Sequence, residues 1–173
     1  MARAEHNSPP EVPEHTLLRQ IGQGAYGEVW LARNALGTYR AAKIIYRSQF
    51  DHERPYEREL RAIHEVEPFT RQHDGLVDIL QVGEREDYFY YIMELADDIS
   101  EESELNPETY QPRTLTMELY ERERLPVENV SSIGASIARA LAFLHENNLV
   151  HRDVKLSNII YVNGRAKLAD VGL

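Results

Sequence analysis

The turn near the amino terminus is rich in glycine and lies between two segments with the composition of β-strands. Gly22, Gly24 and Gly27 fit the pattern G-x-G-x-x-G, and we expect strands over 16–21 and 28–33 on either side. A glycine turn that joins two strands forms a hairpin, unlike the strand-to-helix turn of a Rossmann unit. Backbone N–H groups of such a turn can approach phosphate oxygens closely, because glycine has no side chain. The turn is therefore either a phosphate-binding loop or a plain flexible hairpin tip.

The remaining pattern predicts an α+β protein whose amino-terminal half is mainly an antiparallel sheet. Helical spacing of apolar residues indicates one helix from Pro55 past Val66 and a longer one over 126–147. The dipeptide Asn163-Gly164 is typical of a two-residue hairpin turn. Further strands are expected over 38–46, 76–82, 88–95, 159–162 and 166–169, and a short helix over 114–121.

Composition excludes several classes of function. The 173 residues include no cysteine, which excludes disulfides, cysteine zinc sites and thiol catalysis. The net charge of −10 disfavours binding to nucleic acid or to an anionic membrane surface. No apolar run approaches the ~20 residues that span a bilayer, and the polar leader 1–15 lacks the apolar core of a secretory signal. We therefore expect a cytoplasmic protein with no nucleic acid partner and no membrane segment, whose leader is flexible.

The densest group of chemically reactive side chains lies in the loop that follows the long helix. Asp153 can accept a hydroxyl proton, Lys155 can neutralise charge on a transferred phosphoryl group, and Asn158 offers a carbonyl oxygen to a metal. Asp170 follows the second predicted hairpin, and its carboxylate is a ligand that magnesium prefers. These residue types have the chemistry that phosphoryl transfer needs, and the resemblance described next implies that reaction.

Together these segments resemble the protein kinase family. The glycine pattern extends to G-x-G-x-x-G-x-V through Val29, and residues 41–44 (Ala-Ala-Lys-Ile) are similar to the V-A-I-K strand. Residues 151–158 match H-R-D-x-K-x-x-N without a gap, and residues 170–172 are similar to D-F-G. The resemblance implies a kinase amino lobe and hinge over 16–96, an acidic loop over 97–113, and an incomplete, mainly helical carboxy lobe over 114–173.

The resemblance also implies the ligands and the roles of individual residues. ATP and Mg²⁺ would be the cofactors, with Mn²⁺ as the alternative metal. A Ser or Thr hydroxyl of a protein would be the substrate, because Lys155 favours that specificity over tyrosine. The catalytic residues would be Asp153, Lys155, Lys43 and its helical partner Glu59, with Glu57 as the alternative partner. The metal ligands would be Asn158 and Asp170. The nucleotide would contact Ile21, Gly22, Gly24, Gly27, Val29, Ala41, Lys43, Met93, Glu94 and Ala96.

Two departures from the family pattern affect the expected activity. Val171 replaces the usual phenylalanine, and its smaller side chain fills less of the hydrophobic stack between the lobes. The sequence ends at Leu173, before any activation segment, so we expect a truncated product or a partial reading frame that is a poor catalyst. Two alternatives therefore stay open: a non-catalytic nucleotide-binding module, and a small-molecule phosphotransferase of the aminoglycoside kinase type. The glycine turn and Lys155 weigh against the second.

The segment 97–111 contains six acidic residues. Like charges at this density resist packing, so we expect a surface loop. Its charge would repel ATP, and we therefore expect it to point away from the nucleotide pocket and to be dispensable for nucleotide binding.

Overall fold

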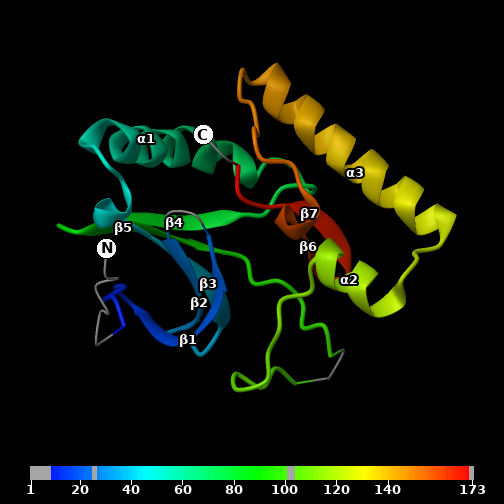
Figure 1. Ribbon diagram of the computed structural model, residues 1–173, viewed down its shortest axis with the longest axis horizontal. Helices are drawn as coiled ribbons and strands as arrows, with labels where there is room; N and C mark the ends of the chain where they lie inside the picture. The colour runs from blue at the N-terminus through cyan, green and yellow to red at the C-terminus, as the bar shows by residue number, and fades with distance from the viewer. Residues whose placement is uncertain (1–8, 25–26, 101–103, 172–173) are drawn as a thin grey trace.

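The computed structural model describes residues 9–24, 27–100 and 104–171. Its largest element is an antiparallel sheet of five strands in the order β1-β2-β3-β5-β4. Helix α1 (Glu53–Thr70) lies alongside this sheet, as Figure 1 shows. The sheet and its helix confirm the predicted architecture of the amino-terminal half. The strands are β1 (His15–Gln23), β2 (Gly27–Asn34), β3 (Tyr39–Tyr46), β4 (Ile79–Glu84) and β5 (Tyr88–Met93).

Successive residues of β3 and β5 pack on opposite faces of the sheet, as the period of two along a strand requires. Ile45 and Tyr91 belong to the hydrophobic cluster on the α1 side, where they join Ile63 of the helix. Ile44 and Tyr90, one position along each strand, belong to a separate cluster on the other face. Both faces of the central strands are therefore buried, which explains the nearly continuous apolar sequence of β5.

The carboxy-terminal part consists of two helices and a small hairpin. The helices are α2 (Leu115–Arg122) and α3 (Val127–Glu146), and the hairpin strands are β6 (Ile159–Val162) and β7 (Arg165–Leu168). Asn163 and Gly164 have φ angles of 51° and 74°, the left-handed backbone that a type I′ turn needs. The predicted hairpin is thus confirmed with its turn. Among the helices described, none is both long and apolar enough to cross a membrane.

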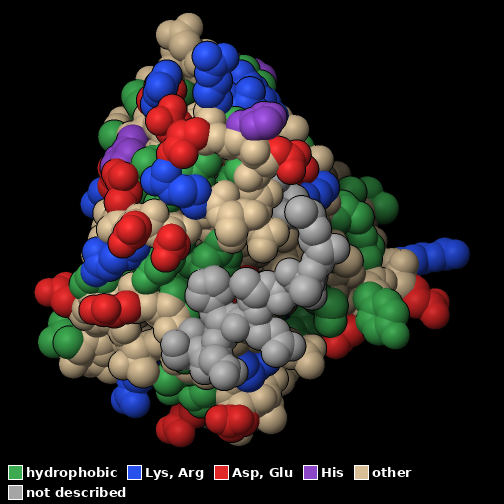
Figure 2. Space-filling view, turned by 60° about the vertical axis from the view of Figure 1, so that its left-hand side comes forward, with side chains coloured by type: hydrophobic (Ala, Val, Ile, Leu, Met, Phe, Trp, Pro, Cys, Tyr) green, Lys and Arg blue, Asp and Glu red, His purple; other side chains and the backbone are tan. Residues whose placement is uncertain are grey.

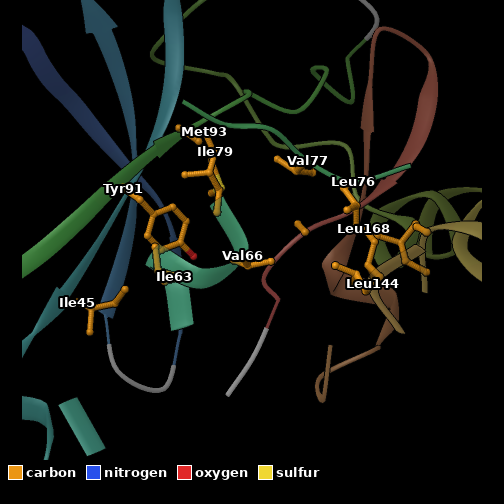
Figure 3. Close-up of a cluster of buried hydrophobic side chains, with 14 of the residues drawn as sticks. Ile45, Ile63, Val66, Leu76, Val77, Ile79, Tyr91, Met93, Leu144 and Leu168 are labelled. Carbon is orange, nitrogen blue, oxygen red and sulfur yellow. The ribbon is translucent and has the colours of Figure 1, made fainter. Parts of the chain in front are cut away.

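One hydrophobic core continues from the sheet into the carboxy-terminal part (Figure 3). Leu76 and Leu168 are both fully buried and form a parallel bridge between the segment before β4 and the end of β7. The N–H of Val77 donates to the carbonyl of Leu168 at 3.0 Å, and Leu144 of α3 packs in the same cluster. The prediction of a strand from residue 76 was therefore wrong at its start, since Leu76 and Val77 pair with β7 and β4 begins at Ile79.

The acidic segment is attached to the fold, which differs from the free surface loop that we expected. Tyr110 is fully buried, and its hydroxyl donates to the carbonyl of Ala96 at 3.0 Å. The Arg19 side chain on β1 donates to the carbonyls of Pro107 (3.0 Å) and Tyr110. The carboxylate of Asp97 accepts the N–H groups of the β6–β7 turn at 2.8 Å. The charge pattern gave no sign of these contacts, because one aromatic residue and one distant arginine provide most of them.

The net negative charge is not concentrated on the face seen in Figure 2. Acidic and basic side chains are interspersed there over the described residues. Ion pairs on the molecule's surface include Arg47 with Glu53 and Arg71 with Glu67. Exposed pairs of this kind contribute about 0–1 kcal/mol each, so the hydrophobic core dominates the stability.

We predict that Leu144→Ala lowers the free energy of unfolding by about 2–5 kcal/mol, because the fully buried leucine would leave a cavity in the shared core. Val130→Ala on the same helix is the matched control. Its side chain is 53% exposed, and the change should stay within about 0.5 kcal/mol. Denaturant titration followed by circular dichroism measures both. Equal losses in the two variants would show that α3 does not pack as described.

Candidate active site

A cleft of about 300 Å³ lies where the glycine turn, β3, the segment after β5 and the β6–β7 hairpin meet. Twelve of the residues expected to bind the nucleotide or the metal, or to act in catalysis, line it together. Three others do not line it: Gly27, Glu59 and Asp153. The twelve are Ile21, Gly22, Gly24, Val29, Ala41, Lys43, Met93, Glu94, Ala96, Lys155, Asn158 and Asp170.

The structure gives different reasons for the presence of glycine at the three positions of the turn. A Cβ atom at Gly27 would lie 1.9 Å from the carbonyl oxygen of Ile44, so no side chain fits between β2 and β3 at this point. Added Cβ atoms at Gly22 and Gly24 would meet only ordinary contacts, at 3.5 and 3.8 Å. Only Gly27 is therefore required by the backbone packing. At the other two positions, the missing side chains leave space in the cleft. The tip of the turn, Ala25 and Tyr26, lies outside the described residues.

Lys43 makes its ion pair with Asp170. Its Nζ lies 2.5 Å from Oδ1 of that carboxylate, and the two residues are 127 positions apart in the sequence. Burial by itself raises the pKa of Asp170, but the nearby Lys43 ammonium and a hydrogen bond from Tyr91 outweigh it, so that the pKa is lowered. Asp170 is therefore ionised at neutral pH.

Glu59 on α1 was expected to be the partner of Lys43, and the structure gives a different pairing. Within the described residues, no ion pair joins Lys43 to Glu59, because the ammonium contacts Asp170 instead. Glu59 is still close enough to be affected by this charge. Burial raises the pKa of Glu59, and Lys43 opposes the rise.

The loop between α3 and β6 holds its three polar residues in one network. Oδ2 of Asp153 accepts hydrogen bonds from Nζ of Lys155 at 2.6 Å and from Nδ2 of Asn158 at 2.9 Å. The bond from Lys155 is the main reason that the pKa of Asp153 is lowered. Asp153 is therefore a carboxylate over the neutral pH range, held by two donors and partly open to solvent.

His151 connects this loop to the residue before Asp170, a role that the sequence did not reveal. Its side chain is only 1% exposed, and Nε2 lies 3.0 Å from the carbonyl oxygen of Ala169. Nδ1 accepts the N–H of Asp153 at 3.4 Å. Burial lowers the pKa of His151, which favours the neutral ring with its proton on Nε2. A neutral, buried histidine thus ties the backbone at Asp153 to the backbone at Ala169.

The oxygen atoms of Asn158 and Asp170 form a donor set that suits a hard divalent cation. Nδ2 of Asn158 donates to both the carbonyl and the carboxylate of Asp153, each at 2.9 Å, and this directs the amide oxygen away from Asp153. Asn158 and Asp170 both line the cleft. Magnesium prefers oxygen ligands, keeps several waters and is often bound through one or two protein groups. The residues present therefore fit a magnesium site completed by phosphate oxygens.

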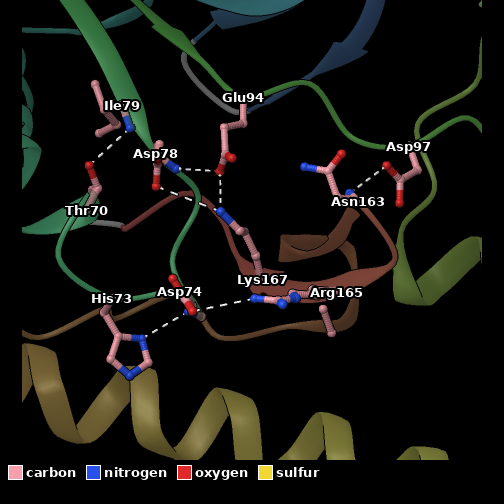
Figure 4. Close-up of polar contacts among 12 residues, drawn as sticks. Thr70, His73, Asp74, Asp78, Ile79, Glu94, Asp97, Asn163, Arg165 and Lys167 are labelled. Atoms are coloured by element: carbon pink, nitrogen blue, oxygen red, sulfur yellow. Dashed lines mark hydrogen bonds and ion pairs between the residues drawn. The ribbon is translucent and has the colours of Figure 1, made fainter.

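Charged side chains hold the segment after β5 in place, as Figure 4 shows. Nζ of Lys167 on β7 lies 2.6 Å from Oε2 of Glu94 and 3.8 Å from Oδ1 of Asp78. The N–H of Glu94 donates to the carbonyl of Asp78 at 3.1 Å. The Glu94 N–H and, through the Tyr110 hydroxyl, the Ala96 carbonyl are thus already used within the protein.

Several residues that line the cleft were not identified from the sequence. Tyr110 belongs to the acidic segment 97–111, which we expected to point away from the pocket, and Pro112 and Thr114 follow that segment directly. That expectation was wrong, because the burial of Tyr110 brings the end of the segment to the cleft. Ile160 could have been identified from the sequence, because it follows Asn158 by two positions in a strand that begins at the cleft. The other additional lining residues are Gln23, Leu95, Ser157 and Ala169.

Comparison with known proteins agrees with this geometry. The family model described as "Protein kinase domain" matches residues 15–173. A probable serine/threonine-protein kinase of Clostridium perfringens is 29% identical over 92% of the chain, and mouse Aurora kinase B is 26% identical over 98%. The membrane-associated tyrosine- and threonine-specific cdc2-inhibitory kinase of Drosophila melanogaster is 28% identical over 90% of the chain.

The chain spans less than half the length of each of these relatives, namely 21%, 45% and 27% in the same order. The matched region nevertheless includes every element that forms the cleft. Since the family model covers nearly the whole sequence, the chain belongs to the protein kinase family.

Proposed function

We propose that this chain binds Mg-ATP in the cleft and takes part in transfer of the γ-phosphoryl group to Ser or Thr hydroxyls of a protein. The observation that carries the proposal is the convergence of cationic, carboxylate and amide side chains from separate elements on one cleft. Lys43 comes from β3, Lys155 and Asn158 from the loop before β6, and Asp170 from the segment after β7. Phosphoryl transfer depends mainly on such positioning and electrostatic stabilisation.

The two ends of the cleft suit the two ends of a nucleotide. Ile21, Val29 and Ala41 provide apolar surface for the base, and Ile160 adds to it from β6. Lys43 would bind phosphate oxygens, and the main chain of the glycine turn would lie over them. A nucleotide whose planar base lies at the segment after β5 and whose triphosphate lies toward Asp170 would fit both ends of the cleft.

The metal would be held by Asp170 and Asn158, with phosphate oxygens completing its shell. Bound magnesium supplies neutralisation of the phosphate charge. Lys43 already contacts the Asp170 carboxylate, so the same residue lies beside the expected position of metal-bound phosphates. Glu59, half-buried on α1, would be the second partner of Lys43 when that ammonium binds phosphate.

Asp153 would orient the substrate hydroxyl and accept its proton. Its carboxylate is partly exposed, which suits contact with a group that comes from another protein. Lys155 holds this carboxylate at 2.6 Å and also lines the cleft, so it would neutralise charge on the transferred group. A lysine at this position of the loop favours serine and threonine over tyrosine in the family that the sequence resembles. One of the relatives is itself named for tyrosine and threonine specificity.

We expect Lys43→Met to weaken Mg-ATP binding by roughly ten- to a hundredfold, because one charge-assisted contact contributes about 1.5–3 kcal/mol. Isothermal titration calorimetry on the two proteins measures the difference. Arg40→Met is the matched control, since Arg40 lies on the same strand but is not among the described residues that line the cleft. Equal affinity of the Lys43 variant and the parent would remove the proposed phosphate contact.

Asp153→Ala should separate binding from transfer. Nucleotide affinity should stay within about twofold, because Asp153 does not line the cleft, whereas phosphorylation of a generic protein substrate should fall by on the order of 10²–10⁴. Radiolabelled ATP gives the transfer rate and calorimetry gives the affinity.

The same pair of measurements separates the proposal from its alternatives. A parent chain that binds Mg-ATP, but transfers phosphate to protein no faster than Asp153→Ala does, would support the non-catalytic nucleotide-binding module. Transfer to a small aminoglycoside but not to protein would support the small-molecule phosphotransferase.

A further inference from the structure

Tyr91 on β5 contributes a buried hydroxyl to the Asp170 carboxylate. The Tyr91 hydroxyl donates to Oδ1 of Asp170 at 2.8 Å, and Nζ of Lys43 lies 2.5 Å from the same oxygen. Tyr91 is 3% exposed, and Lys43 Nζ is 5.8 Å from the centre of its ring. The carboxylate therefore receives two donors on one oxygen, from two neighbouring strands of the sheet.

This geometry restricts how Asp170 can turn. Two donors that converge on Oδ1 hold the plane of the carboxylate and leave Oδ2 as the oxygen for another ligand. Tyr91 cannot move far, because its ring is packed in the core beside Ile45 and Ile63 (Figure 3). Groups that hydrogen-bond a metal-binding carboxylate orient it, and removing such a group typically lowers metal affinity by about 10–100-fold.

Tyr90, the neighbouring residue, shows what a tyrosine of this strand does without such a contact. It is equally buried, at 2% exposed, and faces the other side of the sheet. Its hydroxyl has a weak contact of 3.5 Å with Nε2 of Gln81. Packing alone thus accounts for Tyr90. The Tyr91 hydroxyl instead reaches a carboxylate across 79 residues of sequence.

We propose that Tyr91 is a positioning residue that orients the Asp170 carboxylate for the divalent metal that accompanies ATP. The inference rests on the proposed Mg-ATP site and adds a residue that neither the glycine, lysine nor loop patterns include. Tyr91 acts through Asp170 and does not itself contact the nucleotide or the metal.

The test is Tyr91→Phe, which keeps the ring and removes only the hydroxyl. Calorimetry measures ATP affinity in saturating Mg²⁺ and again in EDTA. We expect roughly tenfold weaker binding in Mg²⁺ and unchanged binding in EDTA, since second partners of metal ligands have effects of about 10–100-fold. Tyr90→Phe should leave both affinities unchanged. Equal Mg²⁺-dependent affinity of Tyr91→Phe and the parent would overturn the inference.

A double variant distinguishes positioning from a general effect on the fold. In an Asp170→Asn background, Tyr91→Phe should cause no further loss of Mg²⁺-dependent affinity, and an additional tenfold loss would contradict the inference.

If Tyr91→Phe unfolds by itself, adding Asp170→Asn should restore folding, because the neutral amide does not need two donors. Failure to restore it would show that the hydroxyl serves only the core. A parent chain whose ATP affinity does not depend on Mg²⁺ would instead refute the proposed site, and the inference with it.

Discussion

The ion pair between Lys43 and Asp170 is the contact on which the geometry of the cleft depends. It joins the central strand of the sheet to the segment after β7, across 127 residues, with side chains that are 16% and 31% exposed. Partly burying two charges carries a desolvation cost, which their attraction repays only when the geometry is good and further hydrogen bonds are present. Tyr91 provides such a hydrogen bond to the same carboxylate. The pair therefore needs a rigid frame that brings β3, β5 and Asp170 together before either charge is stabilised.

The hydrophobic core and one histidine provide this frame. Leu76 and Leu168 connect the sheet to the hairpin, and the hairpin ends two residues before Asp170. The loop that carries Asp153 is linked to the carbonyl of Ala169 by the His151 side chain. The N–H of Ala169 in turn donates to the carbonyl of Asn158 at 2.8 Å. The segments that carry Asp153, Asn158 and Asp170 are thus joined by the His151 side chain and by a main-chain hydrogen bond. Only a neutral His151 makes both of its contacts, and its lowered pKa is consistent with that state.

Local patterns in the sequence were sufficient for the elements and for most of the cleft. The glycine turn, the hairpin at Asn163-Gly164 and the long helix each depend on residues close together in the chain, and all were predicted near their observed positions. Features that depend on distant contacts were not predicted. The buried Tyr110 makes hydrogen bonds with Arg19 and Ala96, and Lys43 pairs with Asp170 instead of Glu59. Composition and spacing do not encode these partners, because each depends on how two separate parts of the core pack.

The chain has only three lysines, and this allows a direct test of where the triphosphate binds. Lys43 and Lys155 line the cleft, whereas Lys167 is not among the lining residues and is paired with Glu94 and Asp78. An acyl phosphate derivative of ATP transfers its acyl group to lysines beside the bound phosphates, and peptide mass spectrometry identifies the labelled residue. Our account predicts labelling of Lys43 and Lys155 that excess Mg-ATP prevents, with Lys167 unlabelled. Labelling of Lys167 alone, or labelling that Mg-ATP does not reduce, would contradict it.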